Sequence, residues 1–139
     1  MASLGSLFGN GVSMRSRESQ IKSYRFRRDE KQRQVNDIEA MIADLMRKYD
    51  DLDQQVRAEE QRTGVTDPNH FNYSMSAKAT RSRRDNLMRS VNELREQLAV
   101  AQNGLNEAVS ELRKAELLAE KETGGQAPIM TATVAHAMR

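Results

Sequence analysis

TGVTDPNH, at residues 63–70, is the stretch that divides this chain into two long helical segments. Gly64 can end a helix in the left-handed conformation, and Pro68 cannot continue a helix because it has no backbone N–H. Asp67 precedes the proline and therefore favours an extended backbone. Ser74 or Ser76 can cap the helix that follows. These residues predict a turn over 63–75 between two helices.

The segment before the turn carries a regular apolar stripe. It contains no proline and no glycine between residues 15 and 62. Alternating four- and three-residue steps select twelve positions, nine of them apolar, which is a heptad seam typical of coiled coils. The positions are Ile21, Tyr24, Arg28, Lys31, Val35, Ile38, Ile42, Leu45, Tyr49, Leu52, Val56 and Glu59. We predict a helix over about 15–62.

The segment after the turn repeats the pattern. Ten positions with the same spacing are all apolar, which predicts a helix over about 76–122. They are Leu87, Val91, Leu94, Leu98, Ala101, Leu105, Ala108, Leu112, Ala115 and Ala119. Gly104 flanks this seam and costs about 1 kcal/mol relative to Ala.

Two seams of similar length around one short turn predict an all-α fold in which the helices form an antiparallel coiled-coil hairpin over residues 15–122. If the turn is centred on Pro68, partner residue numbers sum to 136, and Leu45 faces Val91. This register places Asp50, Asp51 and Asp53 opposite Arg81, Arg83 and Arg84, and it places Arg25–Arg33 opposite Glu107 and Glu111. Oppositely charged residues therefore face each other in the predicted register.

Composition limits the classes of protein. The chain has 139 residues, no cysteine, 4% aromatic residues and a formal net charge of +2, which suits one domain with a narrow apolar seam. Residues 1–14 are predicted to be a flexible tail and residues 123–139 a disordered one. The first residues lack the features of a secretory signal, and no apolar run is long enough to span a bilayer, so we expect a cytoplasmic protein.

An enzyme is the least expected class. The two histidines, His70 and His136, lie in the turn and the tail with no cysteine to join them in a metal site. No phosphate-binding or dinucleotide-binding motif occurs, and a two-helix hairpin offers no cleft for acid–base catalysis. We therefore expect no catalytic residue, no metal, no cofactor and no small-molecule substrate.

Apolar residues beside the seam and in the turn are candidates for partner binding. Met46 and Met88 flank the seam, and Phe71, Tyr73 and Met75 cluster in the turn. They could cap the end of the coiled coil, or they could form an exposed methionine and aromatic patch. The pattern favours neither interpretation over the other.

The first helix begins with a basic stretch. It contains Arg15, Arg17, Lys22, Arg25, Arg27, Arg28, Lys31 and Arg33, with Glu18, Asp29 and Glu30 mixed in. Such a stretch could neutralise nucleic-acid phosphates. The interspersed acids and the lack of a nucleic-acid recognition motif favour a solvated surface that faces protein partners.

Several of these segments resemble the FliJ family of flagellar export proteins, in its alphaproteobacterial form. In the first helix they are RESQIKSYRFRRDEK at 17–31 and QVNDIEAMI at 34–42. Around the turn they are TDPNHFNY at 66–73 and RRDNL at 83–87. The resemblance covers about residues 15–121. Arg28 at a seam position, Ser76 and the 123–139 tail depart from the family pattern.

The resemblance implies a component of the flagellar type III protein export apparatus, associated peripherally with the inner membrane. Its partners would be the hexameric export ATPase, the membrane export gate protein and export chaperones, with no nucleic acid. The open end, with Arg25, Arg27, Arg28, Lys31 and Arg33, would face the ATPase. The turn region would face the gate, where Tyr49 and Tyr73 match family positions and Met46 lies at an expected apolar contact. The alternatives are a generic structural coiled-coil scaffold and a nucleic-acid-binding coiled coil.

Overall fold

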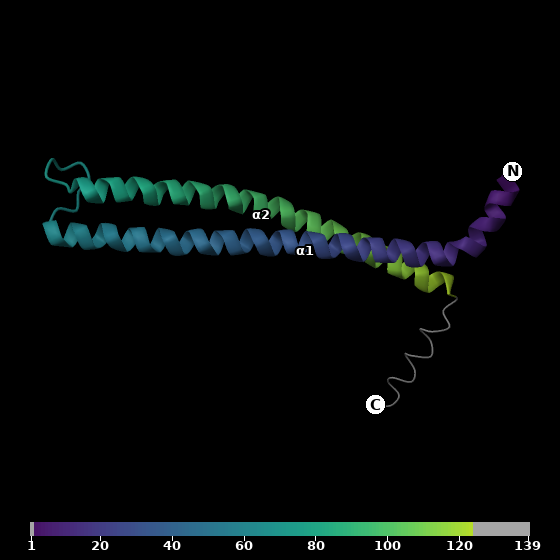
Figure 1. The fold of residues 1–139 in the computed structure, drawn as a ribbon. Helices are drawn as coiled ribbons and strands as arrows, with labels where there is room; N and C mark the ends of the chain where they lie inside the picture. The colour runs from purple at the N-terminus through teal and green to yellow at the C-terminus, as the bar shows by residue number, and fades with distance from the viewer. Residues whose placement is uncertain (1, 124–139) are drawn as a thin grey trace, which may run out of the picture. The chain divides into compact units, whose positions relative to one another are not determined.

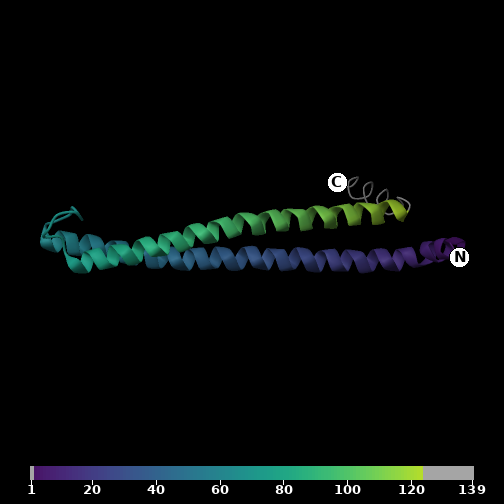
Figure 2. The same cartoon turned by 90° about the horizontal axis from the view of Figure 1, so that it is seen from above.

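The computed structural model describes residues 2–123, with side chains described from residue 15 onward. It contains two helices, α1 (Ala2–Thr63) and α2 (Met75–Glu122), joined by residues 64–74. The helices pack antiparallel, and no strand occurs in residues 2–123. Figures 1 and 2 show the chain reversing its direction between α1 and α2. The predicted all-α class and antiparallel helix pair are confirmed.

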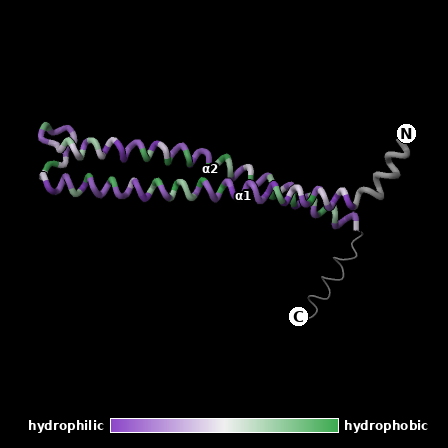
Figure 3. Tube along the Cα trace, in the orientation of Figure 1, coloured by the Kyte–Doolittle hydropathy of each residue, from purple (hydrophilic) through white to green (hydrophobic). Residues whose placement is uncertain are grey.

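The heptad seam is the buried stripe of both helices. All twelve positions predicted in the first helix and all ten predicted in the second are buried or half-buried. Most other side chains of the two helices are exposed, and Figure 3 shows apolar residues recurring at short intervals along largely hydrophilic traces. The 4–3 spacing therefore identified the packed face of each helix.

The chain divides into two compact units, which we describe separately. The turn-end unit comprises residues 33–102 and contains the turn itself. Its buried side chains come from both helices and from the turn, and the fully buried Val56 and Val91 are the largest at its centre. The buried residues are Val35, Leu52, Val56, Tyr73, Ala77, Thr80 and Val91.

The open-end unit comprises residues 2–32 and 103–123 of the described chain. Its buried residues, Ala108, Leu112 and Ala115, all belong to α2. The facing α1 positions are half-buried and include the charged Arg28 and Lys31. Small residues on α2 thus leave room for long α1 side chains, whose stems can cover apolar surface while the charges stay in water.

The helix boundaries match the prediction at the turn and differ from it at the N-terminus. α1 ends at Thr63 and α2 begins at Met75, each within a residue of the expected position. However, α1 extends back to Ala2, whereas we expected it to begin near residue 15. Glycine weakens a helix without breaking it, and no proline occurs in this segment, so its backbone can continue the helical hydrogen bonds. The flexibility predicted for residues 1–14 stays a prediction, and the tail at 124–139 lies outside the described residues.

Candidate partner-binding surfaces

The turn begins with a left-handed glycine. Gly64 has a φ of +76°, and its N–H donates to the carbonyl oxygen of Glu60 at 2.8 Å. This bond is the one expected where a glycine follows the last helical residue in the αL conformation. The N–H of Asn69 then donates to the Asp67 carboxylate, and the N–H of His70 to the Asp67 carbonyl, both at 3.0 Å. Local backbone and side-chain hydrogen bonds therefore hold the loop that the sequence predicted.

Tyr73 fastens the far side of the turn to α1. Its side chain is only 7% exposed, and its hydroxyl donates to the Glu60 carboxylate at 2.6 Å. Burial, followed by the bond to Glu60, raises the pKa of the Tyr73 phenol above its ordinary value. Tyr73 thus caps the seam, which is one of the two interpretations that the sequence left open. Its position four residues before the buried Ala77 is a heptad step, which was the signal available in the sequence.

Ser74 joins the two helices at the start of α2. Its hydroxyl oxygen accepts from the N–H of Ala77 at 3.1 Å, which is an N-cap bond, and its hydroxyl donates to the Glu59 carboxylate at 2.7 Å. Arg62 also donates two hydrogen bonds to Glu59. These bonds from Arg62 and Ser74 lower the pKa of Glu59 to about 2. Of the two expected caps, the structure uses Ser74.

Phe71 and Met75 are the exposed apolar residues of the turn. Phe71 is 89% exposed and stacks on His70 with ring centroids 4.9 Å apart, and Met75 is 77% exposed. The N–H of Asn72 donates to Nδ1 of His70, which holds that ring in place. Each interpretation of the turn therefore holds for some of its residues. Tyr73 caps the seam, while Phe71 and Met75 offer exposed apolar surface.

Met46, Tyr49 and Met88 are half-buried beside or within the seam. Tyr49 lies under Arg84, whose guanidinium carbon is 5.9 Å from the ring centroid. Arg84 also donates to Asp53 at 2.9 Å, and its side chain is only 14% exposed. The predicted apolar seam of the second helix begins at Leu87, yet the charged Arg84 continues the same spacing backward through Tyr73, Ala77 and Thr80. The Asp53–Arg84 pair confirms that part of the predicted register.

The basic cluster of the open-end unit is largely paired with glutamates of α2. Arg27 contacts Glu111 at 2.9 Å, Arg25 contacts Glu116 at 3.5 Å and Arg17 contacts Glu122 at 2.7 Å. The Arg27–Glu111 pair was predicted by the register. The remaining basic site residues are also engaged: Arg28 pairs with Asp29 at 3.0 Å, the Lys31 side chain lies against Gly104, and Arg33 has an interaction of its own.

These open-end pairs place glutamates of α2 beside three of the arginines in the basic stretch. The bidentate pair of Arg17 lowers the pKa of Glu122 and raises that of Arg17, chiefly through the hydrogen bond between them. The pairs of Arg25 and Arg27 are about half exposed. Exposed ion pairs stabilise a fold by roughly 0–1 kcal/mol each, so carboxylates of a partner protein can take the place of these glutamates.

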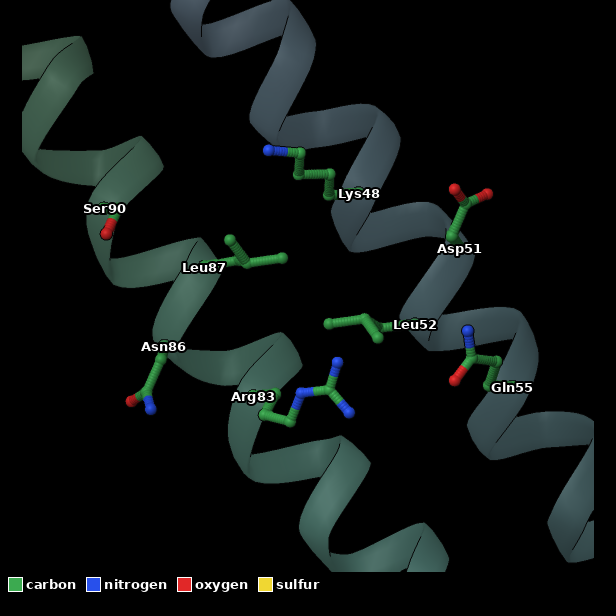
Figure 4. Close-up of a pocket in the computed structure, with 8 residues that line it drawn as sticks. All are labelled: Lys48, Asp51, Leu52, Gln55, Arg83, Asn86, Leu87 and Ser90. Carbon is green, nitrogen blue, oxygen red and sulfur yellow. The ribbon is translucent and has the colours of Figure 1, made fainter.

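A groove lies along one side of the turn-end unit (Figure 4). It has a volume of about 510 Å³ and is open to solvent, and its lining surface is mostly apolar although six of its eight lining residues are polar or charged. Leu52 of α1 and Leu87 of α2 point toward each other at its floor, and Arg83 reaches from α2 toward α1. Its other lining residues are Lys48, Asp51, Gln55, Asn86 and Ser90. Neither the turn patch nor the basic cluster expected from the sequence includes any of these residues.

No group of three or more potential metal ligands occurs among the residues that the structure describes. Within that same part of the chain, neither helix is long and apolar enough to cross a membrane. Comparison with protein families, with curated proteins and with solved structures finds no match for this chain. What the fold itself supports is a two-helix, antiparallel coiled-coil hairpin.

Proposed function

We propose that this chain is a FliJ-like component of the flagellar type III export apparatus, which links the export ATPase ring to the membrane export gate and assists export chaperones. The observation that carries the proposal is the antiparallel two-helix hairpin, which ends in a turn with exposed Phe71 and Met75. The segments at 17–31, 34–42 and 66–73 that resemble the family support it further. A cytoplasmic position beside the inner membrane belongs to this proposal.

The turn would face the gate protein. Phe71 and Met75 are the residues there with apolar surface to lose on binding, and aromatic side chains commonly dominate interface energies. Met46, Tyr49 and Met88 are half-buried and can contribute at the edge of such a contact. Tyr73 is a poor probe of binding, because its removal would open the turn itself.

The open end would face the ATPase through Arg25, Arg27, Arg28, Lys31 and Arg33. Arg25 and Arg27 could leave their half-exposed pairs with Glu116 and Glu111 to bind carboxylates of a partner, since exposed pairs are weak and water can solvate the released glutamates. The glutamates that face these arginines would repel phosphates, which argues against the nucleic-acid alternative. This leaves a generic scaffold as the principal competing function.

Binding assays with purified export ATPase and the cytoplasmic part of the gate protein test this function. The double variant Phe71→Ala with Met75→Ala should bind the gate about tenfold more weakly while its helicity is unchanged. Phe26→Ala is the matched control, because Phe26 is 63% exposed on the open-end unit. If the unmodified chain binds neither protein at micromolar concentrations, the export function is rejected and the scaffold alternative remains.

The ATPase contact has its own test. The double variant Arg25→Glu with Arg27→Glu should weaken ATPase binding and leave gate binding intact. Arg47→Glu is the control, since Arg47 is 71% exposed in the turn-end unit and pairs only within its own helix, with Asp44. Equal losses with the double variant and the control would show that net charge, and not the open end, drives the association.

A further inference from the structure

The groove of the turn-end unit is distinct from both surfaces of the proposed function. Its rim on α1 consists of residues that immediately precede a seam position: Lys48 precedes Tyr49, and Gln55 precedes Val56. On α2, Arg83 and Ser90 hold the equivalent places before Arg84 and Val91. This arrangement defines one flank of the helix pair, which we call the g flank.

The shape of the groove selects an elongated occupant. Pockets for small molecules enclose roughly 70–90% of the ligand surface, whereas this groove is an open feature of the surface between two helices. Two helices with leucines between them form a trough that can accept the ridge of side chains on a third helix. A helical segment therefore fits the groove better than a compact ligand.

Apolar surface continues from the groove along the same flank, away from the turn. Met41 lies one heptad before Lys48 and is 46% exposed, and Val100 lies two heptads after Asn86 and is 72% exposed. Because partner residue numbers sum to about 136, Leu52 lies level with residue 84, and from residue 84 to Val100 the helix rises by roughly 24 Å, which is between four and five helical turns. A partner helix of that length with apolar residues at heptad spacing could contact the whole stripe.

The charge of the rim defines the partner further. In the part of the chain whose side chains are described, Arg83 makes no ion pair, and its guanidinium reaches over the apolar floor. Lys48 has only a 3.8 Å contact with Asp44, between two side chains that are both more than half exposed. Two cations against the single Asp51 favour a partner that carries carboxylates, and they disfavour a second copy of this chain, which would bring the same cations to the contact.

We propose that the g flank of the turn-end unit binds an amphipathic helix of a partner protein, whose apolar stripe packs on Leu52, Leu87, Met41 and Val100 and whose flanking carboxylate pairs with Arg83. The result is a local three-helix packing. This binding site is independent of the export function, because it uses neither the turn apex nor the basic cluster. A scaffold protein could use it equally.

Two fluorescent peptides of about 18 residues provide the probes. Both are alanine-rich helices with leucines at heptad spacing, and they differ only in carrying either glutamates or lysines beside the leucines. In anisotropy titrations with the full chain, the glutamate peptide should bind, and the lysine peptide should bind at least about tenfold more weakly. A photo-crosslinker on the bound peptide should attach to residues 48–55 and 83–90.

Charge reversal then tests the role of Arg83. Arg83→Glu should weaken the glutamate peptide about tenfold and strengthen the lysine peptide, which a loss of folding would not do. Lys48→Glu, on the other helix, should act in the same direction. Arg95→Glu is the matched control, since Arg95 is an exposed arginine of α2 that bonds to Asn92 of its own helix, and neither of these residues lines the groove.

Three outcomes would overturn the proposal. The first is no binding of the glutamate peptide at millimolar concentration, and the second is an equal effect of Arg95→Glu and Arg83→Glu. The third is sedimentation of the unmodified chain as a dimer that Arg83→Glu dissociates, which would assign the groove to a second copy. None of these results depends on binding to the export ATPase or the gate protein.

Discussion

Replacing Arg84 with alanine should lower the free energy of unfolding by about 2–3 kcal/mol. The substitution removes a 2.9 Å hydrogen bond to Asp53, and such charge-assisted bonds contribute roughly 1.5–3 kcal/mol. It also removes the contact with the Tyr49 ring, which is worth about 0.5–1 kcal/mol, and the packing of a mostly buried stem. These contributions overlap, so the expected total is less than their sum.

A double-mutant cycle separates the pair from the rest of the effect. Arg84→Ala, Asp53→Ala and the double variant are compared by urea denaturation followed by far-UV circular dichroism at pH 7. The coupling energy should be about 1–2 kcal/mol, because both side chains are largely shielded from water. Arg84→Met should cost less than Arg84→Ala, since it keeps the stem and since Arg57 still pairs with Asp53 at 3.0 Å.

Arg89→Ala is the control for this cycle. Arg89 is exposed on the same helix, so its removal should change stability by no more than about 0.5 kcal/mol. A coupling energy below about 0.3 kcal/mol, or an Arg84→Ala cost no larger than that of Arg89→Ala, would refute the view that a charged residue stabilises the seam at this position.

Three further predictions concern the glycines and the turn. Gly104→Ala should raise the free energy of unfolding by about 0.5–1 kcal/mol, because the new methyl group meets Lys31 Cδ at an ordinary 3.6 Å; thermal denaturation measures this. Gly64→Ala should instead cost about 1–2 kcal/mol in the same assay, because of the +76° φ. The pKa of Glu59 is lowered from 4.5 to about 2 in the folded state, so as the pH falls Glu59 is protonated in the unfolded state first. Acid titration should therefore show a contribution to stability that is present above about pH 4.5 and is lost toward pH 2. Glu59→Gln should remove that part of the pH dependence, and an unchanged acid transition would contradict the assignment.

The fold could be predicted because the seam depends only on spacing. A side chain every three and a half residues faces the partner helix whatever its neighbours do, and even the charged Arg28 and Lys31 are half-buried where the spacing placed them. The register also followed, within about one turn of helix, from the opposite charges of residues such as Asp53 and Arg84. Local periodicity and charge thus sufficed for the helix pairing.

The candidate sites were less predictable, because they depend on individual side-chain conformations. Tyr73 and Phe71 are two residues apart and both aromatic, yet one is buried against Glu60 and the other is almost fully exposed. The groove between Leu52 and Leu87 depends on how far the flanking side chains lean over the seam, which heptad spacing does not determine. The N-terminal extent of α1 was missed because glycine and serine content indicates low helix propensity without forbidding a helix.

The single hydroxyl of Ser74 has a consequence for how the chain folds. It accepts a hydrogen bond from the N–H of Ala77 in the first turn of α2 and donates one to Glu59 near the end of α1. The N-terminus of α2 and the C-terminus of α1 are therefore joined through one side chain. The loop between them is short, so bringing these groups together carries a small entropic penalty compared with joining distant parts of the chain. Contacts between residues so close in the sequence give a low contact order, which is associated with rapid folding.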